Sequence, residues 1–260
     1  FQAVDLCDRL VLTESDRLEL VVHGAPIPSD ERNLCHQAAR LLAQQAGIEP
    51  KVRIEVFKRI PVGGGLGGGS GNAAGTLAAL NQLWSCGLAD EALESLAAEL
   101  GSDCAFFVRG GAAVGRGRGE RLERLPVPQA WTVLLIGPSQ PVPTGPVYKA
   151  LDGFRPDAGA ATAALEAGLR AGLAPDPAQW LVNDLEAPAS KVSRALAAER
   201  EVVEAEAAGR YRLSGSGGSW FVLTDSPEQA EGLRARLLSV WPGRLVAITR
   251  PVDWGWRQVS

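Results

Sequence analysis

The chain has 260 residues and a formal net charge of −4, from 26 basic and 30 acidic side chains. A chain of this length can bury a full hydrophobic core, in one large domain or in two closely packed ones. Its mild acidity and the lack of a long basic block disfavour nucleic acid and anionic membranes as partners, and no stretch approaches the ~20 apolar residues of a membrane span.

The cysteines show no spacing that is typical of a metal site. Cys7, Cys35, Cys86 and Cys104 form no C-x-x-C pair, and only two histidines could join them. We therefore expect no zinc site, and a chain of this length does not need disulfides. Reduced thiols predict a location in a cytoplasm or in a plastid stroma.

The first 50 residues predict strands followed by one helix. Residues 1–12 favour a strand, a turn and a second strand, and residues 17–22 alternate again, which together predicts an antiparallel meander. Residues 33–42 have the apolar spacing of an amphipathic helix that ends near Gly47, and Asn33 stands where a helix cap is expected.

A glycine-rich segment joins the next strand to the next helix. Alternating apolar residues from Val52 to Ile60 predict a strand that Pro61 closes, and apolar residues at helical spacing predict a helix from Ala73 to Trp84. Between them, seven of the nine residues 63–71 are glycine. Such a loop lets a ligand approach the backbone, and a helix N-terminus presents N–H groups and the positive end of its dipole. The segment therefore predicts a polyphosphate site.

Three other interpretations of this loop are weaker. A P-loop needs a lysine after its last glycine, and this segment has none. Gly63, Gly65 and Gly68 meet the dinucleotide pattern, but residues 90–100 predict another helix where that fold needs a strand. A flexible linker remains an alternative, although linkers rarely lie between two strongly periodic elements.

The segment 61–74, with the pattern Pro-x-Gly-Gly-Gly-Leu-Gly-Gly-Gly-Ser-x-Asn-Ala-Ala, resembles the phosphate loop of the GHMP kinase superfamily. Its long glycine run with an internal leucine is most similar to the 4-diphosphocytidyl-2-C-methyl-D-erythritol kinase family. That family usually has Ser-Ser where this chain has Ser70-Gly71, so one hydroxyl near the phosphates is absent. The resemblance implies ATP and Mg²⁺ as cofactors, with Ser70 near the metal. The implied ATP-binding residues are Pro61, Val62, Gly63, Gly64, Gly65, Leu66, Gly67, Gly68, Gly69, Ser70, Gly71 and Asn33.

A second motif follows the helix at 90–100. Gly101-Ser102-Asp103 precedes an apolar run, residues 104–108, that we expect to be strand-like. This resembles the Gly-Ser/Ala-Asp-x-Pro-x-Phe segment of the same family, whose aspartate is the catalytic carboxylate, although Ala105 replaces the proline. The resemblance implies that Asp103 is catalytic. The alternative is that Asp103 only caps the next turn.

Beyond a strand pair at 110–122, the second half predicts strands and helices in alternation. Residues 211–223 form a second glycine turn between apolar segments, which resembles the third motif of the family and implies that Gly215, Ser216 and Gly217 bind the acceptor. The family also has Pro-Thr at the acceptor pocket, which implies Thr144. The remaining expected elements are a buried strand at 131–136, a turn into a helix at 141–148, helical segments at 157–172 and 183–208, a helix at 227–238 and a strand at 245–248.

The resemblance implies an α+β fold of two domains with an active-site cleft between them. We expect a ribosomal-protein-S5-like α/β domain at 1–126 and a ferredoxin-like α+β domain at 127–260. Because the sequence starts at Phe1 and contains no Met, we expect it to begin inside a longer protein, after the first strand with its Pro-Ala-Lys-x-Asn motif and after the aromatic-His pair that reads cytosine.

The implied function is ATP-dependent phosphorylation of the 2-hydroxyl of 4-diphosphocytidyl-2-C-methyl-D-erythritol, in non-mevalonate isoprenoid biosynthesis. One alternative is another small-molecule kinase of the superfamily, of the homoserine or mevalonate type. A second is a nucleotide-binding fragment with impaired catalysis. The expected partner is a small-molecule substrate, with no nucleic acid and no membrane, and the expected assembly is a monomer or a homodimer.

Overall fold

The computed structural model describes residues 1–117, 119, 121–151, 158–173 and 180–259. Its backbone falls into two compact units. Unit 1 consists of Phe1–Val62, Gly67–Arg124 and Val252–Ser260, and unit 2 consists of Gly63–Leu66 and Leu125–Pro251. The glycine loop therefore contributes residues to both units. The domain boundary expected at 126–127, and the cleft, stay predictions.

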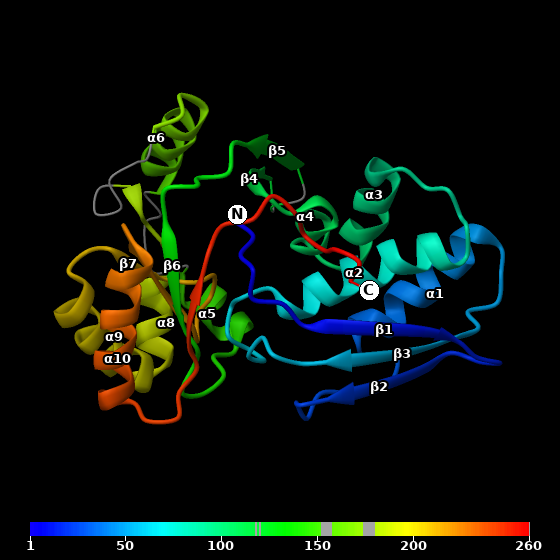
Figure 1. The fold of residues 1–260 in the computed structure, drawn as a ribbon, viewed down its shortest axis with the longest axis horizontal. Helices are drawn as coiled ribbons and strands as arrows, with labels where there is room; N and C mark the ends of the chain where they lie inside the picture. Colours follow the sequence, from blue (N-terminus) through cyan, green and yellow to red (C-terminus); the bar gives the residue numbers. More distant parts are fainter. Residues whose placement is uncertain (118, 120, 152–157, 174–179, 260) are drawn as a thin grey trace. The chain divides into compact units, whose positions relative to one another are not determined.

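The sheet of unit 1 has three strands in the order β1 (Arg9–Glu14), β3 (Val52–Phe57) and β2 (Glu19–His23) (Figure 1). The inward-pointing residues of β3 are almost fully buried, as their alternation predicts. β3 is antiparallel to β1 and parallel to β2, so the expected antiparallel meander is wrong. The physical reason is the helix between β2 and β3, which returns the chain so that β3 inserts parallel to β2. The strand also ends at Phe57 rather than at Ile60.

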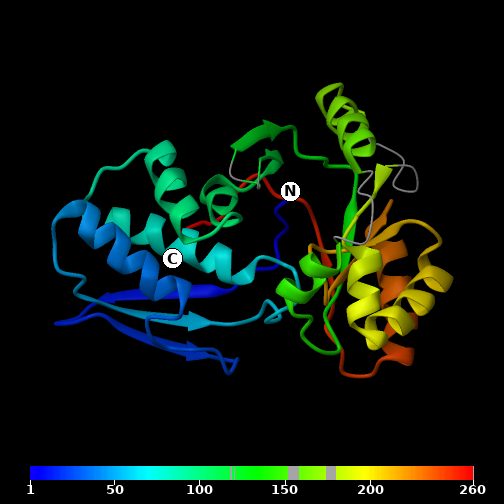
Figure 2. The ribbon, with the colours of Figure 1, turned by 180° about the vertical axis from the view of Figure 1, so that it is seen from behind.

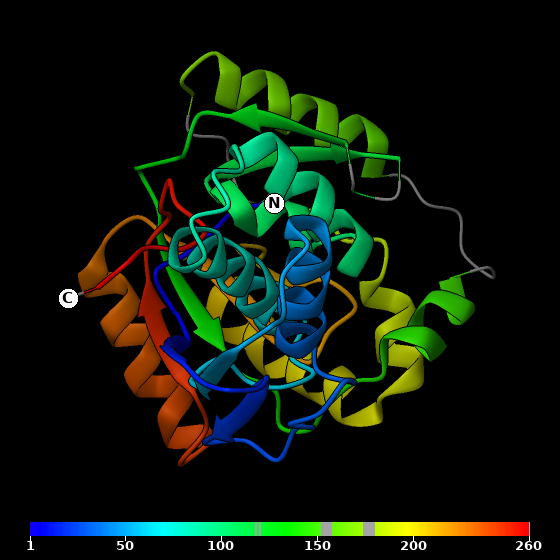
Figure 3. The ribbon, with the colours of Figure 1, turned by 90° about the vertical axis from the view of Figure 1, so that its right-hand side faces the viewer.

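Two helices, α1 (Leu34–Ala46) and α2 (Gly68–Leu83), cover one face of this sheet (Figures 1 and 2). They contact each other along their length, and Figure 3 shows them side by side. α1 matches the prediction: Asn33 caps its start and Gly47, with φ +67°, ends it. Small residues on α2, including Ala73 and Ala74 at 0% exposure, allow the close approach of the two helices.

Helix α3 (Asp90–Leu100) has the predicted bounds, but the next segment differs from the prediction. Residues 104–108 were expected to be strand-like and instead lie in a short helix, α4 (Cys104–Arg109). A short apolar run that is buried on nearly all sides has no period that distinguishes a strand from a helix. Here contacts with α2 and α3 favour the helix. The predicted strand pair follows as β4 (Ala112–Arg116) and β5 (Arg121–Leu125).

Unit 2 is built on a four-stranded antiparallel sheet in the order β7-β8-β6-β9. Its hydrophobic core lies where this sheet packs against helices, and the side chains of Trp220, Leu134 and Leu237 in that core are fully buried. The predicted glycine turn is the connection between β7 and β8. The helix predicted from residue 157 is described from Ala158, and Asp157 lies outside the described residues. The strands are β6 (Thr132–Ile136), β7 (Tyr211–Leu213), β8 (Trp220–Thr224) and β9 (Val246–Thr249), and the helices are α5 (Thr144–Leu151), α6 (Ala158–Arg170), α8 (Glu186–Val192), α9 (Arg194–Ala207) and α10 (Pro227–Val240).

All four cysteines are free thiols, and two of them, Cys35 and Cys104, lie in the core of unit 1. Among the helices of the described residues, none combines the length and the apolar character that crossing a bilayer requires.

Candidate functional site

The glycine run leads directly into helix α2, whose first residue is Gly68. Gly67 occupies the N-cap position with φ +66° and makes no side-chain cap. A β-carbon at Gly67 would lie 2.6 Å from the Phe107 ring, so the close approach of that ring also requires glycine. Without a side-chain cap, the N–H groups of the first turn are available to an external acceptor, and the helix dipole favours an anion there.

The start of α1 lies beside the first turn of α2. A β-carbon added at Gly69 would have Leu34 Cδ1, at 3.9 Å, as its nearest neighbour outside α2, so that position has room for a ligand as well as a helix neighbour. Two helix N-termini therefore meet in unit 1, and both dipoles contribute positive potential to the same place.

Asn33 uses both ends of its amide within the protein. Its Oδ1 accepts a hydrogen bond from Cys35 N at 3.0 Å, and its Nδ2 donates to Pro28 O at 2.7 Å. The capping role that we predicted is confirmed. The implied role beside the nucleotide stays a prediction.

We expect Asn33→Ala to lower the free energy of unfolding by about 1 kcal/mol, because it removes the side-chain acceptor at the start of α1. Urea titration followed by circular dichroism measures this loss. Asn33→Asp keeps an acceptor and is the control, so equal losses for the two variants would contradict the capping role.

Asp103 lies at the N-cap position of α4, but its side chain makes no capping hydrogen bond. The alternative that this carboxylate only caps the turn is therefore not supported. Asp103 reaches solvent, yet partial burial of its carboxyl raises the pKa above the usual value for aspartate. Helix α4, which follows Asp103, packs its Phe107 ring against the first turn of α2, because a β-carbon at Gly67 would lie 2.6 Å and one at Gly71 3.5 Å from that ring.

The other part of the loop, Gly63–Leu66, contacts the second glycine turn within unit 2. Ser214 Oγ donates to Gly65 O at 2.8 Å, and Ser219 N donates to Gly64 O at 3.0 Å. A β-carbon at Gly65 would lie 2.2 Å from Ser214 O, so the approach of the two backbones requires glycine at that position. Gly64 and Gly65 of the first motif are thus hydrogen-bonded to the third motif, about 150 residues later in the chain.

The predicted acceptor-binding residues also meet in unit 2. Thr144 Oγ1 and Ser216 Oγ are 2.9 Å apart. Asn183 Nδ2 donates to Leu213 O and to Gly215 O, both at 2.8 Å, and so fixes the start of the glycine turn. No role was predicted for Asn183 or for Ser214. Asn183 lies 30 residues before its acceptor Leu213, and such a distant contact leaves no local sequence signal.

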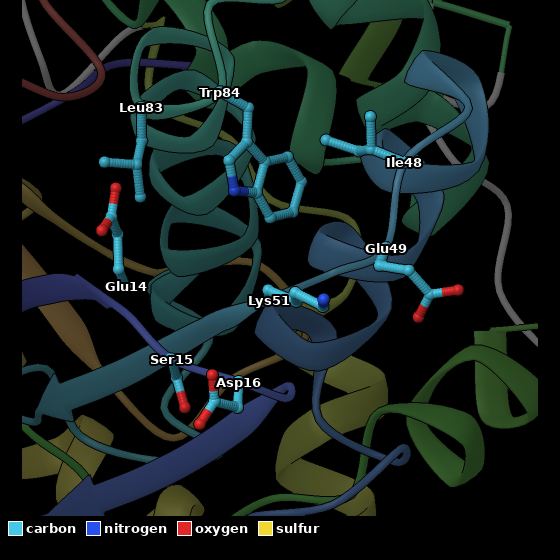
Figure 4. A pocket seen from close by; sticks show the side chains of 8 residues that line it. All are labelled: Glu14, Ser15, Asp16, Ile48, Glu49, Lys51, Leu83 and Trp84. Carbon is cyan, nitrogen blue, oxygen red and sulfur yellow. The ribbon is translucent and has the colours of Figure 1, made fainter.

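A hollow of about 600 Å³ lies at the opposite end of α2, around Trp84 (Figure 4). Glu14, Asp16 and Glu49 supply three carboxylates to its lining, against one ammonium group from Lys51. This charge disfavours a polyphosphate, so the N-terminal end of α2 remains the better candidate. Across the described part of the chain, no group of three or more His, Cys, Asp or Glu is arranged to hold a metal ion.

Comparison with known proteins connects this geometry to a family. Residues 33–111, which carry the glycine loop and Asp103, match the family model described as the GHMP kinases N terminal domain. A 4-diphosphocytidyl-2-C-methyl-D-erythritol kinase from Bacillus cereus is 46% identical over 147 residues, which are 56% of this chain and 51% of that protein. The sequence match therefore spans about half the length of the curated relatives.

Solved structures match over nearly the whole chain. A crystal structure of 4-(cytidine 5'-diphospho)-2C-methyl-D-erythritol kinase has a TM-score of 0.73 at 35% identity, covering 95% of this chain and 87% of that one. Homoserine kinase from Cytophaga hutchinsonii has a TM-score of 0.80 at 23% identity, covering 98% and 89%. The match to homoserine kinase shows a shared fold alone. Both structures agree with the α+β architecture expected from the sequence.

Proposed function

The chain belongs to the GHMP kinase superfamily, and from that membership we propose that it transfers the terminal phosphoryl group of ATP to the 2-hydroxyl of 4-diphosphocytidyl-2-C-methyl-D-erythritol. This reaction is a step of non-mevalonate isoprenoid precursor biosynthesis. The observation that carries the proposal is the glycine run that opens α2, with its first turn packed against Phe107 of α4, the helix that Asp103 precedes.

In the proposed reaction the glycine loop binds the phosphates of ATP, and the Asp103 carboxylate orients the acceptor hydroxyl. The N–H groups at the start of α2 hold the phosphates, while Asp103 positions the acceptor hydroxyl and accepts its proton. A bond forms between the acceptor oxygen and the terminal phosphorus, and the bond from that phosphorus to ADP breaks. The raised pKa of Asp103 suits this role, because a more basic carboxylate is a better proton acceptor.

Mg²⁺ bound to the phosphates would supply neutralisation of their charge. Ser70 fits such an ion, because it lies in the first turn of α2, is partly exposed and offers the hydroxyl oxygen that a hard cation prefers. Thr144, Gly215, Ser216 and Gly217 would contact the acceptor, a role supported by the contact between Thr144 and Ser216.

An acceptor panel tests the proposal. The natural full-length protein is incubated with ATP, Mg²⁺ and one of three acceptors, and the product is identified by mass. We expect one added phosphoryl group on 4-diphosphocytidyl-2-C-methyl-D-erythritol and none on homoserine or mevalonate. Preferential phosphorylation of homoserine or mevalonate would overturn the substrate assignment, and binding of ATP without transfer to any of the three would favour the alternative of impaired catalysis.

A further inference from the structure

A buried carboxylate, Asp8, lies beneath the glycine loop and plays no part in the proposed chemistry. Its Oδ1 accepts hydrogen bonds from Arg59 N at 2.6 Å and from Ile60 N at 2.9 Å. Its Oδ2 accepts from Asn72 Nδ2 at 2.9 Å and is paired with Lys58 Nζ. The side chains of Asp8 and Lys58 are only 1% and 4% exposed, so both charges are taken out of water and depend on each other.

The donors to Asp8 come from both ends of the loop. Arg59 and Ile60 are the last residues before Pro61, and Asn72 lies just after the last glycine, within α2. One carboxylate therefore joins the entry and the exit of residues 61–71 at their base. Beyond the end of β3 at Phe57, Lys58 N still donates to His23 O of β2 at 2.9 Å, and the backbone N–H groups of Arg59 and Ile60 are then directed to Asp8.

The charge of Asp8 is unfavourable at this place unless it is compensated. A buried carboxylate under a loop that binds a polyphosphate would repel the ligand through a medium that screens poorly. Lys58 Nζ lies close to the loop, 3.2 Å from the position that a β-carbon on Gly68 would take. The ammonium group is thus near both the carboxylate and the first turn of α2, where it cancels the field of the carboxylate.

We propose that Asp8 is the positioning residue that closes the base of the phosphate loop, and that Lys58 is its charge partner. ATP affinity then depends on the zero net charge of this ion pair and not on a direct contact of Lys58 with phosphate. The proposal rests on the loop being the ATP site. It differs from the assigned roles of the loop residues, because neither Asp8 nor Lys58 needs to touch the ligand.

A double-mutant cycle on Mg-ATP affinity, measured by titration calorimetry, tests the proposal. We expect Lys58→Met to weaken binding by about tenfold or more, because it leaves an unpaired carboxylate beneath the phosphates. The double variant Lys58→Met with Asp8→Asn removes both charges, and we expect it to recover most of the lost affinity. Glu55→Gln is the control: it removes an ion-paired carboxylate from β3, the strand that ends next to Lys58, where Glu55 bonds Arg53 and His23, and it should leave ATP affinity unchanged.

The outcomes separate the competing roles. Equal loss in Lys58→Met and in the double variant would mean that Lys58 acts on the phosphates directly, and would overturn the proposal. Unchanged ATP affinity in every folded variant would mean that the contacts of Asp8 have a structural role only, and would also overturn the proposal. If the wild-type chain itself failed to bind ATP, the proposed function would fall and not this inference alone.

A second measurement covers the case in which Lys58→Met does not fold. Asp8→Asn leaves an uncompensated ammonium group under the loop, so its ATP affinity should fall more steeply with added salt than that of the wild type. Equal salt dependence for the two proteins would contradict the charge pairing.

Discussion

Replacing Gly67 with Val should abolish the stabilisation that Mg-ATP gives to the folded chain. Gly67 has φ +66°, which a β-branched residue adopts only with strain, and the new β-carbon would lie 2.6 Å from the ring of Phe107. Relief of that clash must move either the start of α2 or α4. The N–H groups of the first turn would then lose the arrangement that holds the phosphates.

Thermal melting with and without Mg-ATP measures this effect. A ligand at 100 times its dissociation constant stabilises the wild type by about 2.7 kcal/mol, and we expect this gain to vanish in Gly67→Val. Gly47→Val is the matched control, because Gly47 has nearly the same φ, +67°, but no atom within 4 Å of a new β-carbon. Gly47→Val should therefore show comparable backbone strain and a full ATP-dependent shift. Equal shifts in both variants would contradict the loop assignment.

Asp103→Asn in the natural full-length protein should lower kcat by about 10²-fold or more, the usual cost of losing a general base, while ATP affinity is retained. The expectation rests on a carboxylate that makes no capping bond and precedes α4, whose Phe107 ring packs against the first turn of α2. Steady-state kinetics and calorimetry separate the two effects. Asp16→Asn, on the exposed turn between β1 and β2, is the control and should change neither quantity. Unchanged turnover in Asp103→Asn would reduce this residue to part of a turn.

The pH dependence of kcat supplies a further check on the same residue. A base acts only when it is ionised, so activity is lost as pH falls through the pKa of Asp103. Burial raises that pKa above its ordinary value of 3.8, and the acidic limb should therefore begin at a higher pH than for an ordinary aspartate. Asp103→Asn should lose this limb while keeping its residual activity.

Much of unit 1 could be predicted because its local signals are strong and agree. Helix α1 carries a cap at each end, α3 has a clear apolar period, and β3 alternates without interruption. The order of the strands could not be predicted in the same way. Whether β3 pairs with β1, with β2 or with both depends on where α1 packs, and that information is spread over the whole unit.

Candidate site residues could be proposed from the sequence where a motif is continuous, and they could not be proposed where a contact is assembled from distant residues. The loop and Asp103 each stand in a recognisable run. Asp8, by contrast, lies about 50 residues before the backbone groups that it accepts from, and the segment around it has no unusual composition. Its role depends on burial and on four donors that only the folded chain brings together.

Hydrogen exchange of backbone amides, with and without a non-hydrolysable Mg-ATP analogue, tests most directly whether the glycine loop holds the nucleotide. We expect slower exchange at residues 63–72, where the loop meets the first turn of α2, and no change around Trp84 at the other end of the same helix. Protection around Trp84, Glu14 and Lys51 with none in the glycine loop would contradict this assignment, because the nucleotide would then occupy the hollow of Figure 4.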